Sequence, residues 1–393
     1  MPSPRLKWNN LPRLLSNTQQ LIDFIKDPLR RNAVFLISTA AANALIGFFF
    51  WTLAARLYSV EDVGRATAMI SAALFLGMLS GLGMGMGMIR FLPESKNRHL
   101  FVRSALTLVG VTALLLSITF VLGLSVWSPA LIFIQGQPLL AAVFIIFTAL
   151  GLCGLIGSFA GGVAVSLLLA GLFLFRLMPG YLPLPAFELD GLKRVFNFSM
   201  GNYLGDISRS LTGMLMPLIV INILGAEQNA YFYIAWMIAN LFFTVSYSVN
   251  ISLVAESSRS PGQLRQYVIK ALKFSFIILI PAVLIMYFIG GWVLGFFGQA
   301  YEQETQGLLR ILLISSLPLA INETYIAVLR VRKLMLPLIV IYGTISLFTL
   351  LAGSLLLDDI GLMGTGIAWL CAQSLMAIVL LIVNRKYWKT SSP

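Results

Sequence analysis

The sequence predicts an all-α integral membrane protein with about eleven hydrophobic helical segments. Of its 393 residues, 59% are hydrophobic and only 11% are charged, and the mean hydropathy is +0.90. The long run from Ser104 to Phe175 contains no Asp, Glu, Lys, Arg or His. The surface of a soluble domain of this length needs far more charge, whereas a surface in contact with lipid does not.

The expected spans are the apolar runs that reach about 20 residues, the length that crosses a bilayer as a helix. They are 33–57, 66–89, 104–126, 200–223, 229–254, 274–297, 308–329, 334–357 and 360–383. The first run is too long for a cleavable signal peptide, so we expect it to remain as a span. The stretch 138–175 is expected to hold one or two more, and a broken or re-entrant pair bent at its glycines is one way to cross.

Charge in the connections predicts the orientation. Lys and Arg outnumber Asp and Glu by 27 to 15, and the excess lies in every second connection. The basic segments are 1–31, 90–103, 176–195, 255–273, 330–333 and 385–389, whereas those near 127–137, 224–229, 298–307 and 358–359 have no Lys or Arg. Basic connections stay on the cytoplasmic side, so both termini are expected there, in the inner membrane. The excess therefore indicates topology rather than nucleic-acid binding.

An internal repeat predicts the domain organisation. One constant offset lays 57–76 over 223–242 and 102–110 over 268–276 without gaps. Such duplication is common in transporters and predicts two six-helix-type repeats, the first of which lacks one span and a loop. We expect an amphipathic and basic N-terminus (1–31), an N-terminal bundle (32–178), a loop (179–195), a C-terminal bundle (196–384) and a cytoplasmic tail (385–393).

The segment "LAARLYSVEDVGRATAMISAALFLGMLSGLGMGMGMIRFLPE" (53–94) resembles the N-terminal signature of polysaccharide biosynthesis flippases. These exporters of O-antigen, capsule and exopolysaccharide repeat units belong to the MOP superfamily. The resemblance implies a MATE-like two-bundle transporter that moves undecaprenyl-diphosphate-linked oligosaccharide across the membrane by alternating access. It also implies membrane lipids as partners, and a polysaccharide polymerase and glycosyltransferases as candidate partners.

Arg209 is the first candidate for the substrate pathway. It lies nine residues past Met200, or about 14 Å into its span at 1.5 Å per residue. Asp206 lies three residues earlier, on the same helix face. Arg209 either faces a cleft and attracts the diphosphate, or forms a structural pair with Asp206. The repeat places Asn43 at the equivalent position of the first half.

A polar ridge marks the 229–254 span. Asn240, Thr244, Ser248 and Ser252 recur at four-residue spacing, with Asn250 nearby. The ridge either lines the cleft and meets sugar hydroxyl groups, or forms hydrogen bonds between helices.

Glu323, with Asn322 beside it, is the second ionisable candidate because charges within spans are expensive. It either titrates with a proton gradient, pairs with Arg209 across the bundle interface, or is an interfacial carboxylate near Arg330.

Helix flexibility is expected at three glycines and two prolines. Gly77, Gly81 and Gly85 form one ridge at four-residue spacing, which serves either tight packing or a hinge. Pro217 and Pro318 lie inside spans and are expected to kink them.

Neither catalytic residues nor a cofactor are expected. The single histidine, His99, lies in a charged loop, and Cys153 and Cys371 lie in apolar runs, so no metal site is expected. Coupling to a proton or sodium gradient is left open.

Three rival functions remain. A multidrug cation antiporter of the same superfamily is expected to hold a carboxylate inside its N-terminal bundle, whereas Glu61, Asp62 and Glu94 here lie in loops. A membrane enzyme would need larger loops and clustered acids. The shortened first half keeps a non-transporting partner of a polysaccharide assembly complex as an alternative.

Overall fold

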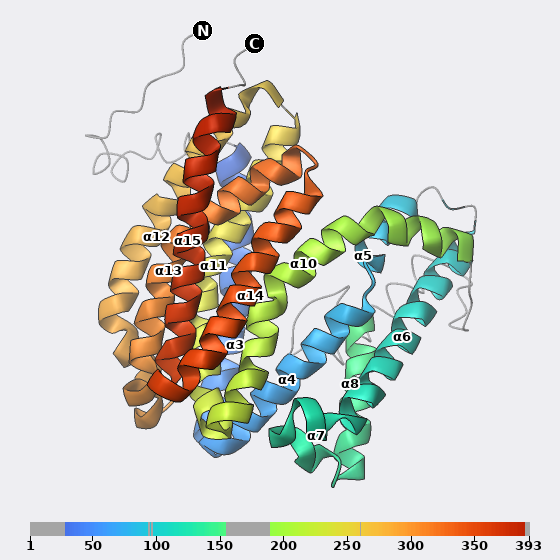
Figure 1. Ribbon diagram of the computed structural model, residues 1–393, viewed down its shortest axis with the longest axis vertical. Helices are drawn as coiled ribbons and strands as arrows, with labels where there is room; N and C mark the ends of the chain where they lie inside the picture. The colour runs from blue at the N-terminus through green and yellow to red at the C-terminus, as the bar shows by residue number, and fades with distance from the viewer. Residues whose placement is uncertain (1–27, 93–94, 96, 155–188, 260, 390–393) are drawn as a thin grey trace.

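The computed structural model describes residues 28–92, 95, 97–154, 189–259 and 261–389, and the fold in these ranges is entirely helical (Figure 1). Along the chain the helices are α3 (Pro28–Leu57), α4 (Val60–Ser80), α5 (Met84–Phe91), α6 (Arg98–Leu122), α7 (Leu124–Trp127), η2 (Pro129–Ile134), α8 (Pro138–Gly154), α10 (Leu189–Leu224), α11 (Ala226–Arg259), η3 (Pro261–Gln263), α12 (Leu264–Gly295), α13 (Gln299–Val331), α14 (Met335–Ile360) and α15 (Leu362–Lys389). The prediction of an all-α fold is confirmed.

Nine helices in the described ranges are long and apolar enough to cross a membrane, and α8 is a shorter apolar helix. The chain is therefore a multi-pass membrane protein. Of the stretch 138–175, α8 accounts for the first part and ends at Gly154, whereas 155–188 lie outside the described residues. The expected basic segment 1–31 lies mostly outside them as well.

Helix starts follow local capping chemistry. The Ser59 hydroxyl accepts a hydrogen bond from the backbone N–H of Asp62 at the start of α4. The side chain of Asn97 accepts one from the N–H of Leu100 at the start of α6. Ser and Asn satisfy the free N–H groups of a first helical turn, which is why these helices begin where they do.

The internal repeat is visible in the helix boundaries. The offset that lays 57–76 over 223–242 also carries the first residues of α4 and α6 onto the first residues of α11 and α12. The series α3, α4, α6 and α8 thus corresponds to α10, α11, α12 and α13. The two final helices, α14 and α15, have no counterpart among the described residues of the first half.

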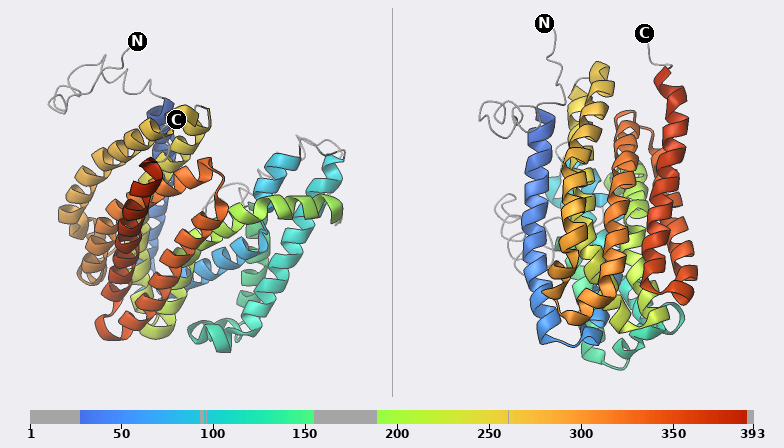
Figure 2. Two further views of the ribbon diagram at one scale, coloured as in Figure 1. Left: turned by 45° about the horizontal axis from the view of Figure 1, so that its top comes forward. Right: turned by 90° about the vertical axis from the view of Figure 1, so that its left-hand side faces the viewer.

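Helix α3 of the first half packs on the second half, and helix α10 of the second half contacts both groups of helices. Helices α11 to α15 form one bundle, and α4, α6 and α8 pack together beside it, with the long helix α10 in contact with both groups (Figures 1 and 2). Helix α3 packs mainly on α11, although we expected it in the N-terminal bundle. Its Trp51 belongs to the core of the second half and lies 5.0 Å from the ring of Tyr233.

For orientation, we call the end where α3 begins and the α13–α14 turn lies the basic end. The far end holds the α3–α4 turn, η2 and the α12–α13 turn. The far end is tightly packed where α4 crosses α11. There the carbonyl of Gly64 accepts a 2.8 Å hydrogen bond from the Asn229 amide, and a Cβ on Gly64 would lie 1.7 Å from the Ala226 carbonyl oxygen.

The expected span 66–89 is broken. Helix α4 ends at Ser80, and α5 starts at Met84 after a turn in which Leu82 and Gly83 have φ values of 46° and 70°. The Tyr203 hydroxyl donates a 2.6 Å hydrogen bond to the Leu79 carbonyl, one of the acceptors that the break leaves free.

The break also changes which glycine makes the close contact. A Cβ on Gly83 would lie 2.9 Å from the Cβ of Ser199 on α10. A Cβ on Gly85 would have no neighbour within 4 Å in the described part of the chain, so Gly85 makes no close helix contact there, although we expected the ridge of Gly77, Gly81 and Gly85 to serve either tight packing or a hinge. The two expected prolines, Pro217 and Pro318, lie inside α10 and α13.

Candidate functional site

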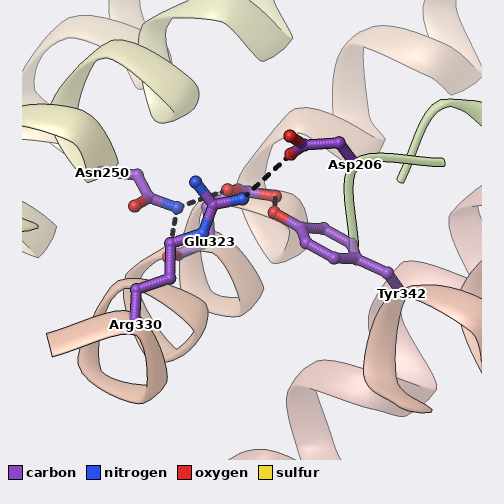
Figure 3. Close-up of polar contacts among 5 residues, drawn as sticks. All are labelled: Asp206, Asn250, Glu323, Arg330 and Tyr342. Atoms are coloured by element: carbon purple, nitrogen blue, oxygen red, sulfur yellow. Dashed lines mark hydrogen bonds and ion pairs between the residues drawn. The ribbon is translucent and has the colours of Figure 1, made fainter. Parts of the chain in front are cut away.

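A buried carboxylate lies at the centre of a polar cluster in the second half (Figure 3). Glu323 on α13 is only 3% exposed. The Tyr342 hydroxyl of α14 donates to its Oε1 at 2.8 Å, and the Asn250 amide of α11 donates to its Oε2 at 2.6 Å. Asn250 also donates to the Glu323 carbonyl at 3.0 Å. A buried carboxylate needs such donors to replace lost water.

Toward the basic end, the cluster continues as an ion pair. Arg330 Nη2 on α13 donates to Asp206 Oδ1 on α10 at 3.3 Å (Figure 3). The two side chains are 29% and 41% exposed. The Nε of Arg330 is buried without a hydrogen-bond partner. The Arg330 side chain is therefore partly exposed, while its Nε donor is buried and unused.

Arg209 lies one helical turn beyond Asp206, and its guanidinium group stacks over the ring of Tyr247 at 4.9 Å. It lines a cavity of about 10 Å³ together with Glu323, Asn322, Tyr342 and other residues. That volume is close to the minimum for one water molecule. Arg209 and Glu323 line the same cavity, while Asp206 pairs with Arg330, so the expected Asp206–Arg209 pair is not the ion pair that forms.

The cavity lies inside the second half. Its walls come from α10, α11, α13, α14 and α15, so Arg209 and Glu323 meet within one bundle and not across the interface between bundles. Around it, the side-chain oxygens of Asn250 and Asn322 and the indole N–H of Trp369 are buried without partners. Of these, Asn322 and Trp369 line the cavity itself.

Asn322 connects the cluster to α15. Its amide donates to the carbonyl of Gln373 at 2.9 Å and to the Gln373 Oε1 at 2.7 Å. The polar column thus runs from the Asp206–Arg330 pair, past Glu323, to Gln373.

The polar ridge of α11 divides into two parts. Asn240 is exposed, and the Thr244 hydroxyl donates to the Asn240 carbonyl of its own helix at 2.7 Å. Ser248 and Asn250 are buried. Asn43 is exposed on α3 and is not part of the cluster.

Three residues of the cluster were missed from the sequence, and a fourth was misplaced. The sequence predicts Arg330 in a connection because the expected span ends at 329, whereas α13 continues to Val331. Tyr247, Tyr342 and Gln373 lie among apolar residues and carry no charge that marks them. In the ranges that the structure describes, no group of three His, Cys, Asp or Glu residues is arranged to hold a metal ion.

The chain is similar to a known protein family and to solved structures. A family model described as "Polysaccharide biosynthesis protein" matches residues 132–305. Among solved structures, the lipid II flippase MurJ in an inward closed conformation matches with a TM-score of 0.69 and 13% identity, over 89% of this chain and 87% of that one. No curated protein matches the chain.

Two further structures have the same fold. An inward-facing multidrug resistance MATE transporter of the MOP superfamily matches with a TM-score of 0.66 and 16% identity, over 92% of this chain and 100% of that one. A MOP superfamily transporter from Pyrococcus furiosus matches at 0.56 and 14% identity, over 92% and 95%. The protein has the fold of a MOP superfamily transporter, as the MATE and MurJ likeness shows.

Proposed function

We propose that the protein is a flippase that moves undecaprenyl-diphosphate-linked oligosaccharide repeat units across the cytoplasmic membrane by alternating access. The observation that carries this proposal is the pair of guanidinium groups, Arg330 and Arg209, placed in succession along one polar column. The match to a polysaccharide biosynthesis family model and the fold shared with a lipid II flippase support it. A large sugar head group cannot cross bare hydrocarbon without such a polar path.

The diphosphate is the group that these cations suit. Guanidinium groups bind phosphate oxygens through parallel N–H donors. Arg330 is partly exposed, has an unused Nε donor and is held by Asp206 through one long hydrogen bond. An arriving diphosphate therefore displaces a weak partner. Arg209 is the next cation along the path, and the exposed amide of Asn240 is available to sugar hydroxyl groups.

The coupling ion, in this proposal, acts at Glu323. This carboxylate lies in the same cavity as Arg209 and is held by Tyr342 and Asn250. Binding a proton or a sodium ion there changes the balance of charge next to Arg209, which links the gradient to the affinity for an anion. Comparing translocation by wild type and Glu323→Gln with and without each gradient tests this step.

The second candidate is a multidrug cation antiporter, which the fold shared with MATE transporters favours. Against it, the buried carboxylate Glu323 lies in the second half and is accompanied by two guanidinium groups. In the described part of the first half, the acids are Glu61 and Asp62, both exposed near the start of α4. A drug-resistance assay separates the two: the flippase proposal predicts no protection.

Deleting the protein in its host tests the proposal directly. The measurement is the leaflet in which undecaprenyl-linked oligosaccharide collects. We expect accumulation on the cytoplasmic leaflet and recovery when the wild-type chain is restored. An unchanged distribution in a host without a redundant exporter would contradict the proposal. The polymerase and glycosyltransferases that make the polymer are the expected partners, and the basic end is expected to face the cytoplasm.

A further inference from the structure

Arg310 is an arginine of the α13 span that has no acidic partner. It lies where α13 runs beside α12 (Figure 1). Its guanidinium group stacks over the ring of Tyr287 at 4.9 Å, and its Nε donates to the Tyr287 carbonyl at 3.4 Å. Among the described residues no carboxylate pairs with Arg310, and its side chain is only partly buried. A charge within a span is costly, so such an arginine needs an anion from outside the chain.

The position of Arg310 along α12 brings it close to the lipid head groups at the far end. Trp292 on α12 is 68% exposed, and tryptophan gathers at the level of the head groups. Tyr287 lies five residues back along α12, or about 7 Å deeper at 1.5 Å per residue. The side chains of α13 tilt toward its N-terminus, which lies at the far end. The guanidinium group of Arg310 is therefore directed from the hydrocarbon toward the head groups.

Two more polar side chains follow Arg310 toward the far end. Gln306 lies one turn beyond it on α13, and Glu302 lies two turns beyond it. A Cβ on Gly291 of α12 would lie 2.8 Å from the Gln306 Nε2 and 3.5 Å from the Glu302 Oε1. A Cβ on Gly295 would lie 3.2 Å from the Glu302 Oε2. The groove between α12 and α13 thus presents a guanidinium group, an amide and a carboxylate in that order toward the far end.

We propose that this groove binds the head group of one phospholipid that carries a phosphate and a primary ammonium, as phosphatidylethanolamine does. The phosphate binds Arg310, and the ammonium binds Glu302. The order fits, because the phosphate of such a lipid lies next to the acyl chains and the ammonium lies farther out. A guanidinium group suits phosphate oxygens, and a carboxylate accepts hydrogen bonds from an ammonium group. The Gln306 amide lies between the two and donates to the phosphate.

The charges of the groove also predict which lipids bind less well. Phosphatidylglycerol has the phosphate but no cation, so its head group leaves Glu302 without a partner beside an anion. Phosphatidylcholine has a quaternary ammonium, which has no N–H to donate to the carboxylate. The site lies on the outside of the second half, away from the cavity of Arg209 and Glu323. It goes beyond the proposed function and does not depend on it.

Native mass spectrometry of the full chain in detergent provides the test. The protein is titrated with phosphatidylethanolamine, phosphatidylglycerol and phosphatidylcholine that carry the same acyl chains. We expect phosphatidylethanolamine to bind about tenfold more tightly than either of the others, as for one charge-assisted hydrogen-bonded contact. Equal or tighter binding of phosphatidylglycerol would show a site for anionic lipids in general and would overturn the assignment of the ammonium to Glu302.

Variants test each end of the groove. Arg310→Gln is expected to weaken phosphatidylethanolamine binding about tenfold, and Arg310→Lys to weaken it less. Arg332→Gln is the matched control, because Arg332 is an exposed arginine at the basic end, and it should bind as wild type does. Unchanged binding of phosphatidylethanolamine by Arg310→Gln would overturn the proposal.

Glu302→Gln keeps the proposal testable if Arg310→Gln does not fold, because Glu302 is exposed. This variant should bind phosphatidylethanolamine less tightly and phosphatidylglycerol more tightly, so the ratio of the two affinities falls by about tenfold or more. The ratio is measured within one sample and does not depend on the amount of folded protein. A ratio equal to that of wild type would contradict the site. No oligosaccharide is present, so the result is independent of whether the protein exports one.

Discussion

The Tyr342 hydroxyl donates a 2.8 Å hydrogen bond to the Glu323 carboxylate in the interior of the second half. Both side chains are buried, at 5% and 3% exposure. Together with the Asn250 amide on the other carboxylate oxygen, this contact lets an acidic group reside among apolar helices. The buried carboxylate thus depends on two hydrogen-bond donors from neighbouring helices.

Removing the Tyr342 hydroxyl is expected to destabilise the protein. Tyr342→Phe should cost about 1.5–3 kcal/mol, the range for a hydrogen bond to a charged group. The cost should shrink in a Glu323→Gln background, because the two changes remove one interaction. Thermal unfolding in detergent measures both, with Tyr58→Phe, an exposed tyrosine, as the control. Equal costs in the two backgrounds would show that the hydroxyl does not act through Glu323.

The α4–α5 break is expected to depend on Gly83. Gly83→Ala places a side chain at φ +70°, with its Cβ 2.9 Å from Ser199. We expect a loss of about 1–2 kcal/mol from the left-handed backbone alone. Gly85→Ala is the matched control, since its Cβ meets nothing within 4 Å, and it should stabilise the helix by about 0.5–1 kcal/mol. Similar effects at both positions would contradict the assigned break.

The crossing of α4 and α11 is expected to tolerate no side chain at Gly64. A Cβ there would lie 1.7 Å from the Ala226 carbonyl oxygen, which is backbone and cannot turn aside. Gly64→Ala should therefore separate the helices and cost more than about 4 kcal/mol, the size of the most severe substitutions. Folded yield by size-exclusion chromatography is the readout. Gly47→Ala on α3, with nothing within 4 Å, should express normally.

Composition and periodicity predicted most of the fold, because hydropathy marks a span regardless of its neighbours. The repeat also predicted where α11 and α12 begin relative to α4 and α6. The packing of α3 on the second half could not be predicted, since an apolar helix face in lipid does not specify its partner.

The site was only partly predictable for a related reason. Arg209, Glu323 and Asn250 stood out as polar residues within spans, which are costly and therefore noticeable. Their arrangement depends on helix rotation, which the sequence does not reveal. The glycine ridge likewise indicated either tight packing or a hinge near the end of α4, whereas only the structure shows that Gly83 has positive φ against α10.

The Asp206–Arg330 pair is expected to matter more for transport than for stability. Both side chains are partly exposed, so Asp206→Asn should change the free energy of unfolding by less than about 1 kcal/mol. If Asp206 competes with the diphosphate for Arg330, its neutralisation should alter the apparent affinity for substrate. Substrate titration in proteoliposomes measures this, and a large stability loss with unchanged affinity would contradict the role.

The most direct test of the central claim measures translocation of a fluorescent lipid-diphosphate oligosaccharide in proteoliposomes. Because Arg209→Leu alone leaves Glu323 without the cation that lines the same cavity, the double variant Arg209→Leu/Glu323→Gln keeps the charges balanced. The account predicts a folded double variant whose translocation rate falls at least about tenfold, as expected for loss of a charge-assisted phosphate contact. Glu323→Gln alone is expected to retain translocation that no longer depends on an ion gradient. Arg332→Leu is expected to behave as wild type. Full translocation by the double variant would contradict a cation-lined path through the second half.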